Sequence, residues 1–230
     1  MRHAPLEVLP TAVLALVLTG CGSSPAVHFY TLSSSAAPAP GEAVPAGAVP
    51  SVGLGPITLS DVVDRPQFVL RTGANQVVIT EEHRWAEPLK SEIPRVIAEN
   101  LARILGVKQV WSYPQGAAET ADIRVLVNVQ RFDSAPGEAA TIDVSWTVQR
   151  KPGEPVPGRS LVKEPASGSG YDALAAAHSR ALASVSRDIA VAVRALGQAA
   201  AEPASAASSS PSTPSPAASA PPASAPASSP

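Results

Sequence analysis

Alternation of apolar and polar residues predicts two long strands in the second half of the chain. Residues 123–130 and residues 140–149 place apolar side chains at every second position, so each strand buries one face. The Pro136-Gly137 pair between them is typical of a turn. After two further Pro-Gly pairs, a short strand is expected at residues 160–163.

The first half of the chain predicts shorter strands. Residues 27–32 are rich in β-branched and aromatic side chains, and residues 52–59 are mostly apolar. Two glycines and a proline in the second of these segments favour an edge strand or a bulge. Residues 67–71 and 76–80 flank a Thr-Gly-Ala-Asn segment and are expected to form a hairpin. Residues 107–113 predict one more strand.

Two amphipathic helices are expected beside these strands. From Pro88 to Leu105 the apolar residues recur at helical spacing, and Gly106 stands where a glycine commonly ends a helix. Pro94 either kinks this helix or marks its true start. The Ala-rich segment from Tyr171 to Leu196 predicts a second, longer helix. The order of elements predicts an α+β fold, in which a largely antiparallel sheet carries two main helices on one face.

Composition divides the 230-residue chain into regions. Residues 199–230 contain only Ala, Ser, Pro and Thr apart from one Glu, and are expected to form a disordered tail. Residues 33–50 have a similar composition and are expected to form a flexible loop or linker. All nine aromatic residues lie between Phe29 and Tyr171. The expected folded domain therefore spans residues 21–198.

Charge argues against a nucleic-acid partner. Residues 51–198 carry 16 Lys and Arg against 16 Asp and Glu, with no basic cluster. Such a balanced surface offers no attraction for a phosphate backbone. No apolar run reaches the roughly 18 to 20 residues of a membrane-spanning helix.

The sequence contains no recognisable catalytic or metal-binding motif. A P-loop is excluded because no lysine follows a glycine, and the G-x-S-x-G elbow of many hydrolases is also missing. His28, His83 and His178 lie in different predicted elements and lack the spacing of metal ligands. We therefore expect no catalytic residue, no metal and no cofactor.

The N-terminus has the pattern of an export signal. Arg2 and His3 precede the apolar residues 8–18, and the segment ends in Leu18-Thr19-Gly20-Cys21. This quartet resembles a bacterial lipobox. The resemblance implies that residues 1–20 form a signal peptide and that Cys21 is the lipidated first residue of the mature protein. The alternative is an ordinary secretory signal followed by a chance cysteine.

Several short motifs, taken in order, resemble a known family. They are Cys21, His-Phe-Tyr-Thr-Leu at 28–32, Gly-Leu-Gly-Pro-Ile-Thr-Leu-Ser-Asp at 53–61, Asp-Arg-Pro-Gln at 64–67, His-Arg-Trp-Ala-Glu-Pro-Leu at 83–89 and Glu-Asn-Leu-Ala at 99–102. Together they resemble the ABC-type transport auxiliary lipoprotein family, the group of the PqiC lipoproteins. The resemblance covers roughly Cys21 to Leu196.

This resemblance implies a function in the bacterial envelope. The protein would be a non-catalytic, periplasm-facing lipoprotein that works with an MCE-domain protein and inner-membrane transporter components in lipid transport between membranes. Self-association is also implied. Gly22, directly after the lipobox cysteine, favours the outer membrane. The alternative is a structural envelope lipoprotein that contacts the cell wall through residues 199–230.

Two of the family motifs supply candidate partner-binding residues. They are Asp64, Arg65, Pro66, Gln67, Arg84 and Trp85. Arginine and tryptophan frequently anchor protein interfaces, which favours a partner contact. In the alternative, the tryptophan caps the core and the arginines pair with nearby acids.

The height of the domain above the membrane depends on residues 27–32. If they dock as a strand, only residues 22–26 separate the lipid from the fold, a reach of roughly 17 Å. Residues 33–50 then form an internal loop. If they do not dock, residues 33–50 form a long linker.

Overall fold

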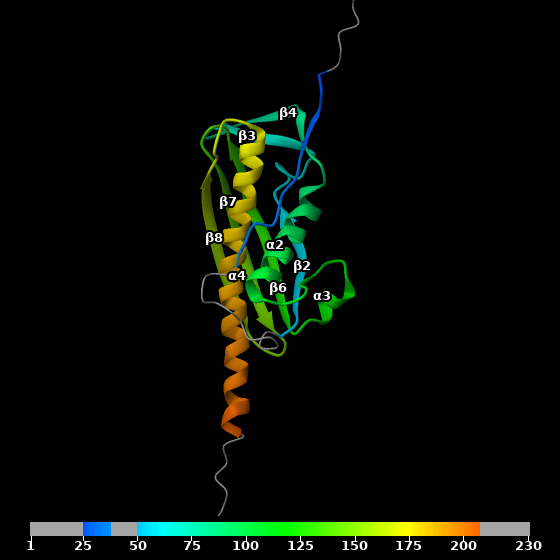
Figure 1. Cartoon of the computed structure of the whole chain (residues 1–230), viewed down its shortest axis with the longest axis vertical. Coiled ribbons are helices and arrows are strands. Elements are labelled where there is room, and N and C mark those ends of the chain that lie inside the picture. The colour runs from blue at the N-terminus through cyan, green and yellow to red at the C-terminus, as the bar shows by residue number, and fades with distance from the viewer. Residues whose placement is uncertain (1–24, 38–49, 208–230) are drawn as a thin grey trace, which may run out of the picture.

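The computed structural model describes residues 25–37 and 50–207. They form one mixed sheet with the two long helices on the same face (Figure 1). The elements in chain order are β1 (His28–Tyr30), β2 (Val52–Leu59), β3 (Gln67–Gly73), β4 (Gln76–Trp85), α2 (Leu89–Leu105), β5 (Trp111–Ser112), α3 (Gly116–Thr120), β6 (Ile123–Ala135), β7 (Ala139–Arg150), β8 (Pro155–Pro165) and α4 (Tyr171–Ala207). The predicted α+β fold is confirmed.

Strand β6 organises the sheet. One edge of β6 pairs antiparallel with β7 from Ile123↔Arg150 to Ala135↔Ala139, and β8 continues the sheet beyond β7. The other edge pairs parallel with β2 and then meets β3 at Ser134. The hairpin β3–β4 is antiparallel, as predicted, and β1 lies parallel to the end of β4. Parallel pairings thus join segments that are distant in the sequence.

Strand β2 contains the predicted bulge but lies inside the sheet, between β6 and β5. Its register with β6 shifts between Leu54 and Ile57. Gly53 permits a close approach to α3, because a Cβ atom on Gly53 would stand 2.2 Å from the carbonyl oxygen of Ala118. Glycine is therefore required by packing at this position.

Helix α2 has nearly the predicted limits. Gly106 adopts a left-handed conformation with φ of 67°, and its N–H points to the carbonyls of Ala102 and Arg103. Pro94 lies inside the helix and does not mark its start. The apolar residues of α2 face the core, and Ile93, Val96 and Ile97 are fully buried.

Several elements differ from the predicted limits, and β4 and β6 each continue five residues past their predicted ends. Residues 107–113 contribute only the two-residue strand β5, because just Gly53 and Leu54 of β2 pair with it. The short helix α3 was not predicted. Strand β8 is longer than residues 160–163, and helix α4 continues to Ala207, past its predicted end and into the segment expected to be disordered. Residues 208–230 lie outside the described residues.

The core lies between the sheet and the two long helices. The predicted inward positions of β6 and β7 are buried except Trp146, which is partly buried. On the predicted apolar side of α4, Leu196 is partly buried, and the residues with at most 1 % exposure are Leu174, Ala181, Leu182, Val185, Ile189 and Val193. Periodicity alone therefore located most of the core.

Residues 31–37 are held against both long helices by buried polar groups. The N–H of Leu32 donates to Glu92 Oε1 at 2.7 Å, and the N–H of Ala36 donates to Asn100 Oδ1 at 3.0 Å. From α4, Ser179 Oγ accepts a 3.1 Å bond from the N–H of Ser33. Strand β1 is thus docked, and the part of the predicted flexible loop that the structure describes is fixed in place. Residues 38–49 lie outside the described residues.

Candidate partner-binding surface

The β2–β3 loop, residues 60–66, positions several of the predicted contact residues. The N–H groups of Val63 and Asp64 both donate to the carbonyl of Ser60, at 3.0 and 3.1 Å. Asp64 forms an ion pair with Lys90 at the start of α2. The hydrogen bond from Lys90 to Asp64 raises the pKa of the Lys90 ammonium. The loop is therefore tied to the helix that follows β4.

Gln67 and Arg84 meet on the neighbouring strands β3 and β4, where they are register partners. Both side chains approach Glu81: Gln67 Nε2 and Arg84 Nη2 each lie 3.5 Å from Glu81 Oε2. Arg84 Nε also donates to the carbonyl of Glu81 at 2.9 Å. We call Asp64, Arg65, Pro66, Gln67 and Arg84 the loop surface.

Trp85 does not belong to this surface. Only 4 % of it is exposed, and its ring stacks on Phe68 with 4.0 Å between centroids. Its edge faces Phe132, and its main-chain N–H donates to the carbonyl of Pro66 at 2.7 Å. Trp85 is therefore a core residue, and its main chain holds the β2–β3 loop at Pro66. A direct partner contact would require the indole to leave the core.

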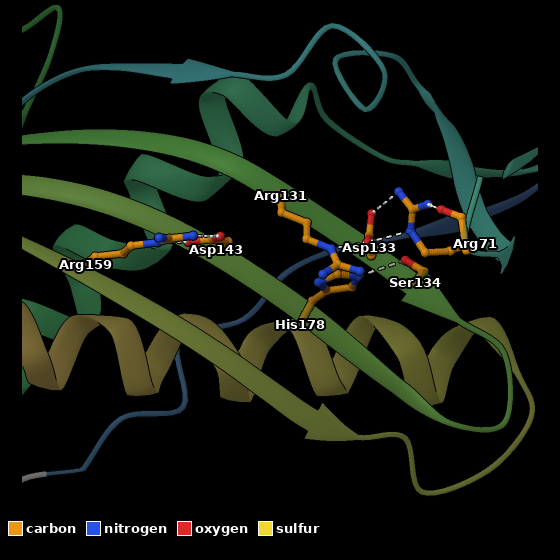
Figure 2. Close-up of polar contacts among 8 residues, drawn as sticks. Arg71, Arg131, Asp133, Ser134, Asp143, Arg159 and His178 are labelled. Atoms are coloured by element: carbon orange, nitrogen blue, oxygen red, sulfur yellow. Dashed lines mark hydrogen bonds and ion pairs between the residues drawn. The ribbon is translucent and has the colours of Figure 1, made fainter. Parts of the chain in front are cut away.

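A second polar group, which sequence reasoning missed, lies on the outer face of the sheet. Arg71 holds Asp133 with two hydrogen bonds, of 2.6 and 3.1 Å, and Arg131 binds the same carboxylate (Figure 2). Arg159 holds Asp143 with two bonds, of 2.8 and 2.6 Å. We call these five residues the charged ladder.

Both carboxylates of the charged ladder are held in the ionised form. Burial by itself would raise the pKa of Asp133, but the hydrogen bonds from Arg71 and Arg131 outweigh it and lower that pKa. The hydrogen bond from Arg159 lowers the pKa of Asp143. The ladder therefore presents fixed charges of both signs at neutral pH.

One sequence signal for the ladder existed. Counting outward from a three-residue turn at 136–138 places Arg131 opposite Asp143, as the β6–β7 register has it. The contribution of Arg71 had no such signal, because β3 and β6 are far apart in the sequence and meet at a single parallel pairing.

A surface pocket of about 350 Å³ connects the ladder to the β2–β3 loop. Ser60, Val62 and Val63 line it from the loop side, and Arg71, Gln130, Arg131, Phe132, Asp133 and Asp143 line the rest. Val62 is largely exposed at its rim. The lining combines charged residues with the apolar Val62, Val63 and Phe132, which suits a partner side chain of mixed character.

The only Ser–His contact found among the described residues is sealed in the core. Ser134 Oγ lies 2.8 Å from His178 Nε2, and both residues are almost completely buried (Figure 2). Burial lowers the pKa of His178 to about 3, with a small opposing effect of Asp133. His178 Nδ1 has no hydrogen-bond partner, so no carboxylate orients the ring. The pair is a structural contact between β6 and α4.

Cys21 lies outside the described residues, four positions before Pro25. Its lipidation stays a prediction from the lipobox. Among the residues that the structure describes, no helix combines the length and apolarity needed to cross a bilayer.

The sequence profile of a family described as the ABC-type transport auxiliary lipoprotein component matches residues 30–190. The chain belongs to this family. Family membership makes the chain an auxiliary lipoprotein associated with a transport system. The predicted family resemblance is confirmed over most of the folded domain.

Solved structures share the fold of this auxiliary lipoprotein. The protein XCC0632 from Xanthomonas campestris is 17% identical, with a TM-score of 0.63, and the match covers 76% of this chain and 99% of that one. An uncharacterised protein of known structure is 20% identical, with a TM-score of 0.60 and coverage of 74% and 99%. Among proteins with curated functions, none matches this chain.

Proposed function

We propose that this auxiliary lipoprotein is a non-catalytic subunit of an MCE-type lipid transport system, anchored in the outer membrane by acylated Cys21. The observation that carries the proposal is the position of the two chain ends. Residue 25 and β1 lie at one end of the long axis, and α4 runs along the sheet and ends at the other (Figure 1). We call the end that carries β1 and β4 the anchor end.

The docked strand β1 keeps the domain close to the membrane. Pro25 stands four positions after Cys21, a reach of at most about 14 Å. The 37 residues of α4 extend about 55 Å at 1.5 Å per residue. The helix therefore leads away from the anchored membrane, toward the inner-membrane components of the transport system.

The partner-binding site proposed here combines the loop surface, the pocket and the charged ladder. Arg131 and Arg159 each keep exposed side chains, 47 % and 62 %, although both already bind a carboxylate. Each guanidinium has five N–H donors, so donors remain for carbonyl or carboxylate groups of an MCE-domain protein. The pocket between loop and ladder would receive one of its side chains.

Affinity purification from detergent-solubilised envelopes tests this proposal. The wild-type chain with a C-terminal tag is expected to recover an MCE-domain protein together with an ABC permease, identified by mass spectrometry. Arg131→Ala and Arg159→Ala together are expected to reduce that recovery. Arg187→Ala, an exposed arginine on α4, is the matched control and should leave it unchanged. Cys21→Ser should remove the protein from the membrane fraction.

Recovery of only peptidoglycan fragments or other outer-membrane lipoproteins would contradict the adaptor role. That result would favour the second candidate, a structural lipoprotein that reaches the cell wall through residues 199–230. One observation supports this alternative: α4 carries the chain to the end of the molecule opposite the anchor end (Figure 1). Deleting residues 199–230 distinguishes the adaptor role from the structural role, because only the structural role requires them.

A further inference from the structure

An unusual set of apolar residues is exposed at the anchor end. Val77, Val78 and Ile79 of β4 are about equally exposed, at 39, 43 and 42 %. Phe29 in β1 is 64 % exposed and Val27, just before it, is 42 % exposed. We call these five residues the apolar rim. Scattered exposed apolar residues are common, but four of these belong to strands β1 and β4, which pair at residues 83–85 of β4, and Val27 directly precedes β1.

The exposure of three consecutive strand residues means that both faces of β4 are uncovered there, although Val69 and Leu70, the partners of two of them in β3, are buried. Successive side chains of a strand point to opposite faces of the sheet. Since Val77, Val78 and Ile79 are all exposed, neither face of β4 is covered at this point by the helices or by residues 25–37. This part of β4 therefore lies at the margin of the packed core.

The backbone edge of the same segment is open as well. Strand β1 pairs with β4 only at His83, Arg84 and Trp85, so residues 76–82 have no strand on that side among the described residues. Edge strands of this kind promote unwanted pairing unless charge or proline protects them. The opposite edge strand, β8, carries three prolines. Residues 76–80 have neither proline nor charge.

The apolar rim lies where the chain approaches the membrane. Figure 1 shows β4 across the end of the molecule from which residue 25 departs. From Pro25 to the proposed lipidation site at Cys21 the chain can span at most about 14 Å. The bilayer surface is therefore within reach of β1 and β4, whereas the outer end of α4 is directed away from it.

We propose that the apolar rim rests in the interfacial region of the bilayer to which Cys21 is anchored, so that this auxiliary lipoprotein contacts the membrane through β1 and β4 as well as through its acyl chains. The proposal rests on the lipid anchor of the proposed function. Lipid covers the open faces and edge of β4, and polar headgroups with their water satisfy its backbone N–H and C=O groups.

The contact is shallow and does not depend on anionic lipid. Glu81 and Glu82 are exposed on the same strand, directly after the rim, and their carboxylates stay in water. They also disfavour a strongly negative surface. Contact at headgroup depth holds the domain in one orientation, with α4 pointing into the periplasm, which a flexible lipid tether alone does not achieve.

Site-specific fluorescence quenching tests the contact. Acylation consumes the thiol of Cys21, the only cysteine of the chain, so Val78→Cys in the lipidated protein gives a single free thiol for an environment-sensitive fluorophore. The protein is reconstituted in phosphatidylethanolamine–phosphatidylglycerol vesicles that contain a lipid with a doxyl quencher close to its headgroup. Val191→Cys is the matched control, since Val191 is an exposed valine on α4, about 30 Å along the helix from Tyr171.

We expect quenching to be several-fold stronger at position 78 than at position 191. The same ratio is expected in phosphatidylcholine vesicles that contain the doxyl lipid. Equal quenching at the two positions, in protein that floats with the vesicles, overturns the membrane contact and leaves the lipid anchor intact. A blue-shifted emission at position 78 without doxyl quenching also overturns it, because a protein surface then covers the rim. Failure of the wild-type protein to float better than Cys21→Ser refutes the anchor itself.

Discussion

The backbone N–H of Leu32 donates a hydrogen bond of 2.7 Å to the fully buried carboxyl group of Glu92, 60 positions further along the chain. Residues 31–37 cannot form a strand ladder here, so their backbone donors need side-chain acceptors in the core. Glu92 and Asn100, polar residues on the buried side of α2, supply them. Residues 31–37 are thereby fixed against the helices of the domain.

Replacing Glu92 by alanine is expected to destabilise the fold. Glu92→Ala leaves the Leu32 N–H buried without an acceptor, which costs about 1–3 kcal/mol of unfolding free energy. Glu92→Gln keeps an acceptor oxygen and is expected to cost much less. Urea unfolding at neutral pH measures both, with the exposed Glu87→Ala as control. Equal losses for the alanine and glutamine variants would contradict this role.

Stability is expected to fall in mild acid because of His178. Its pKa is about 3 in the folded protein and 6.5 when unfolded, so only the unfolded chain takes up a proton as the pH falls between these values. One such proton lowers the unfolding free energy by about 1.4 kcal/mol per pH unit. The effect is absent above pH 6.5 and grows as the pH decreases toward 3.

Urea unfolding of the wild type and of His178→Gln at several pH values measures this dependence. The variant loses the stacking on Phe132, so its stability is lower at every pH. Its stability should nevertheless decrease less steeply between pH 6.5 and pH 4. Parallel curves would show that His178 is protonated in the folded protein.

Trp85 and Arg84 are adjacent, but their substitution by alanine is expected to lower the free energy of unfolding by very different amounts. Trp85→Ala removes a core ring stacked on Phe68 and should cost about 3–5 kcal/mol of unfolding free energy. Arg84→Ala removes a half-exposed ion pair with Glu81 and should cost about 0–1 kcal/mol. Thermal and urea unfolding measure both values.

Only Arg84→Ala is informative about the loop surface, since it leaves the fold intact. We expect it to weaken capture of the MCE-domain protein in the affinity purification. Unchanged capture by Arg84→Ala would remove this arginine from the partner-binding site.

Gly53→Ala is expected to destabilise the protein by about 1–3 kcal/mol, because the added methyl group collides with backbone of α3 and cannot be relieved by a rotamer change. Gly116→Ala is the matched control: a Cβ at Gly116 meets nothing within 4 Å, so a small gain or no change is expected. The midpoints of urea unfolding compare the two. If Gly53→Ala left the free energy of unfolding unchanged, α3 would be able to shift and make room for the methyl group.

The sequence by itself determined the elements whose signals are local. Period-two alternation located β6 and β7, helical spacing with Gly106 located α2, and the apolar side of α4 was correctly assigned to the core. These patterns work because each element buries one face and the repeat of its backbone decides which residues share that face. The order of short motifs likewise indicated the family that the profile match confirmed.

Only the tertiary structure decided which distant segments meet. The parallel pairings β1–β4 and β2–β6, the burial of Trp85 and the contact of Arg71 with Asp133 all join segments that no local pattern relates. Parallel register depends on long crossover connections, and the burial of a single aromatic residue depends on what packs above it. For the same reason, the apolar rim became apparent only when β4 was seen to lack neighbours on both faces at the end from which the chain leads to Cys21.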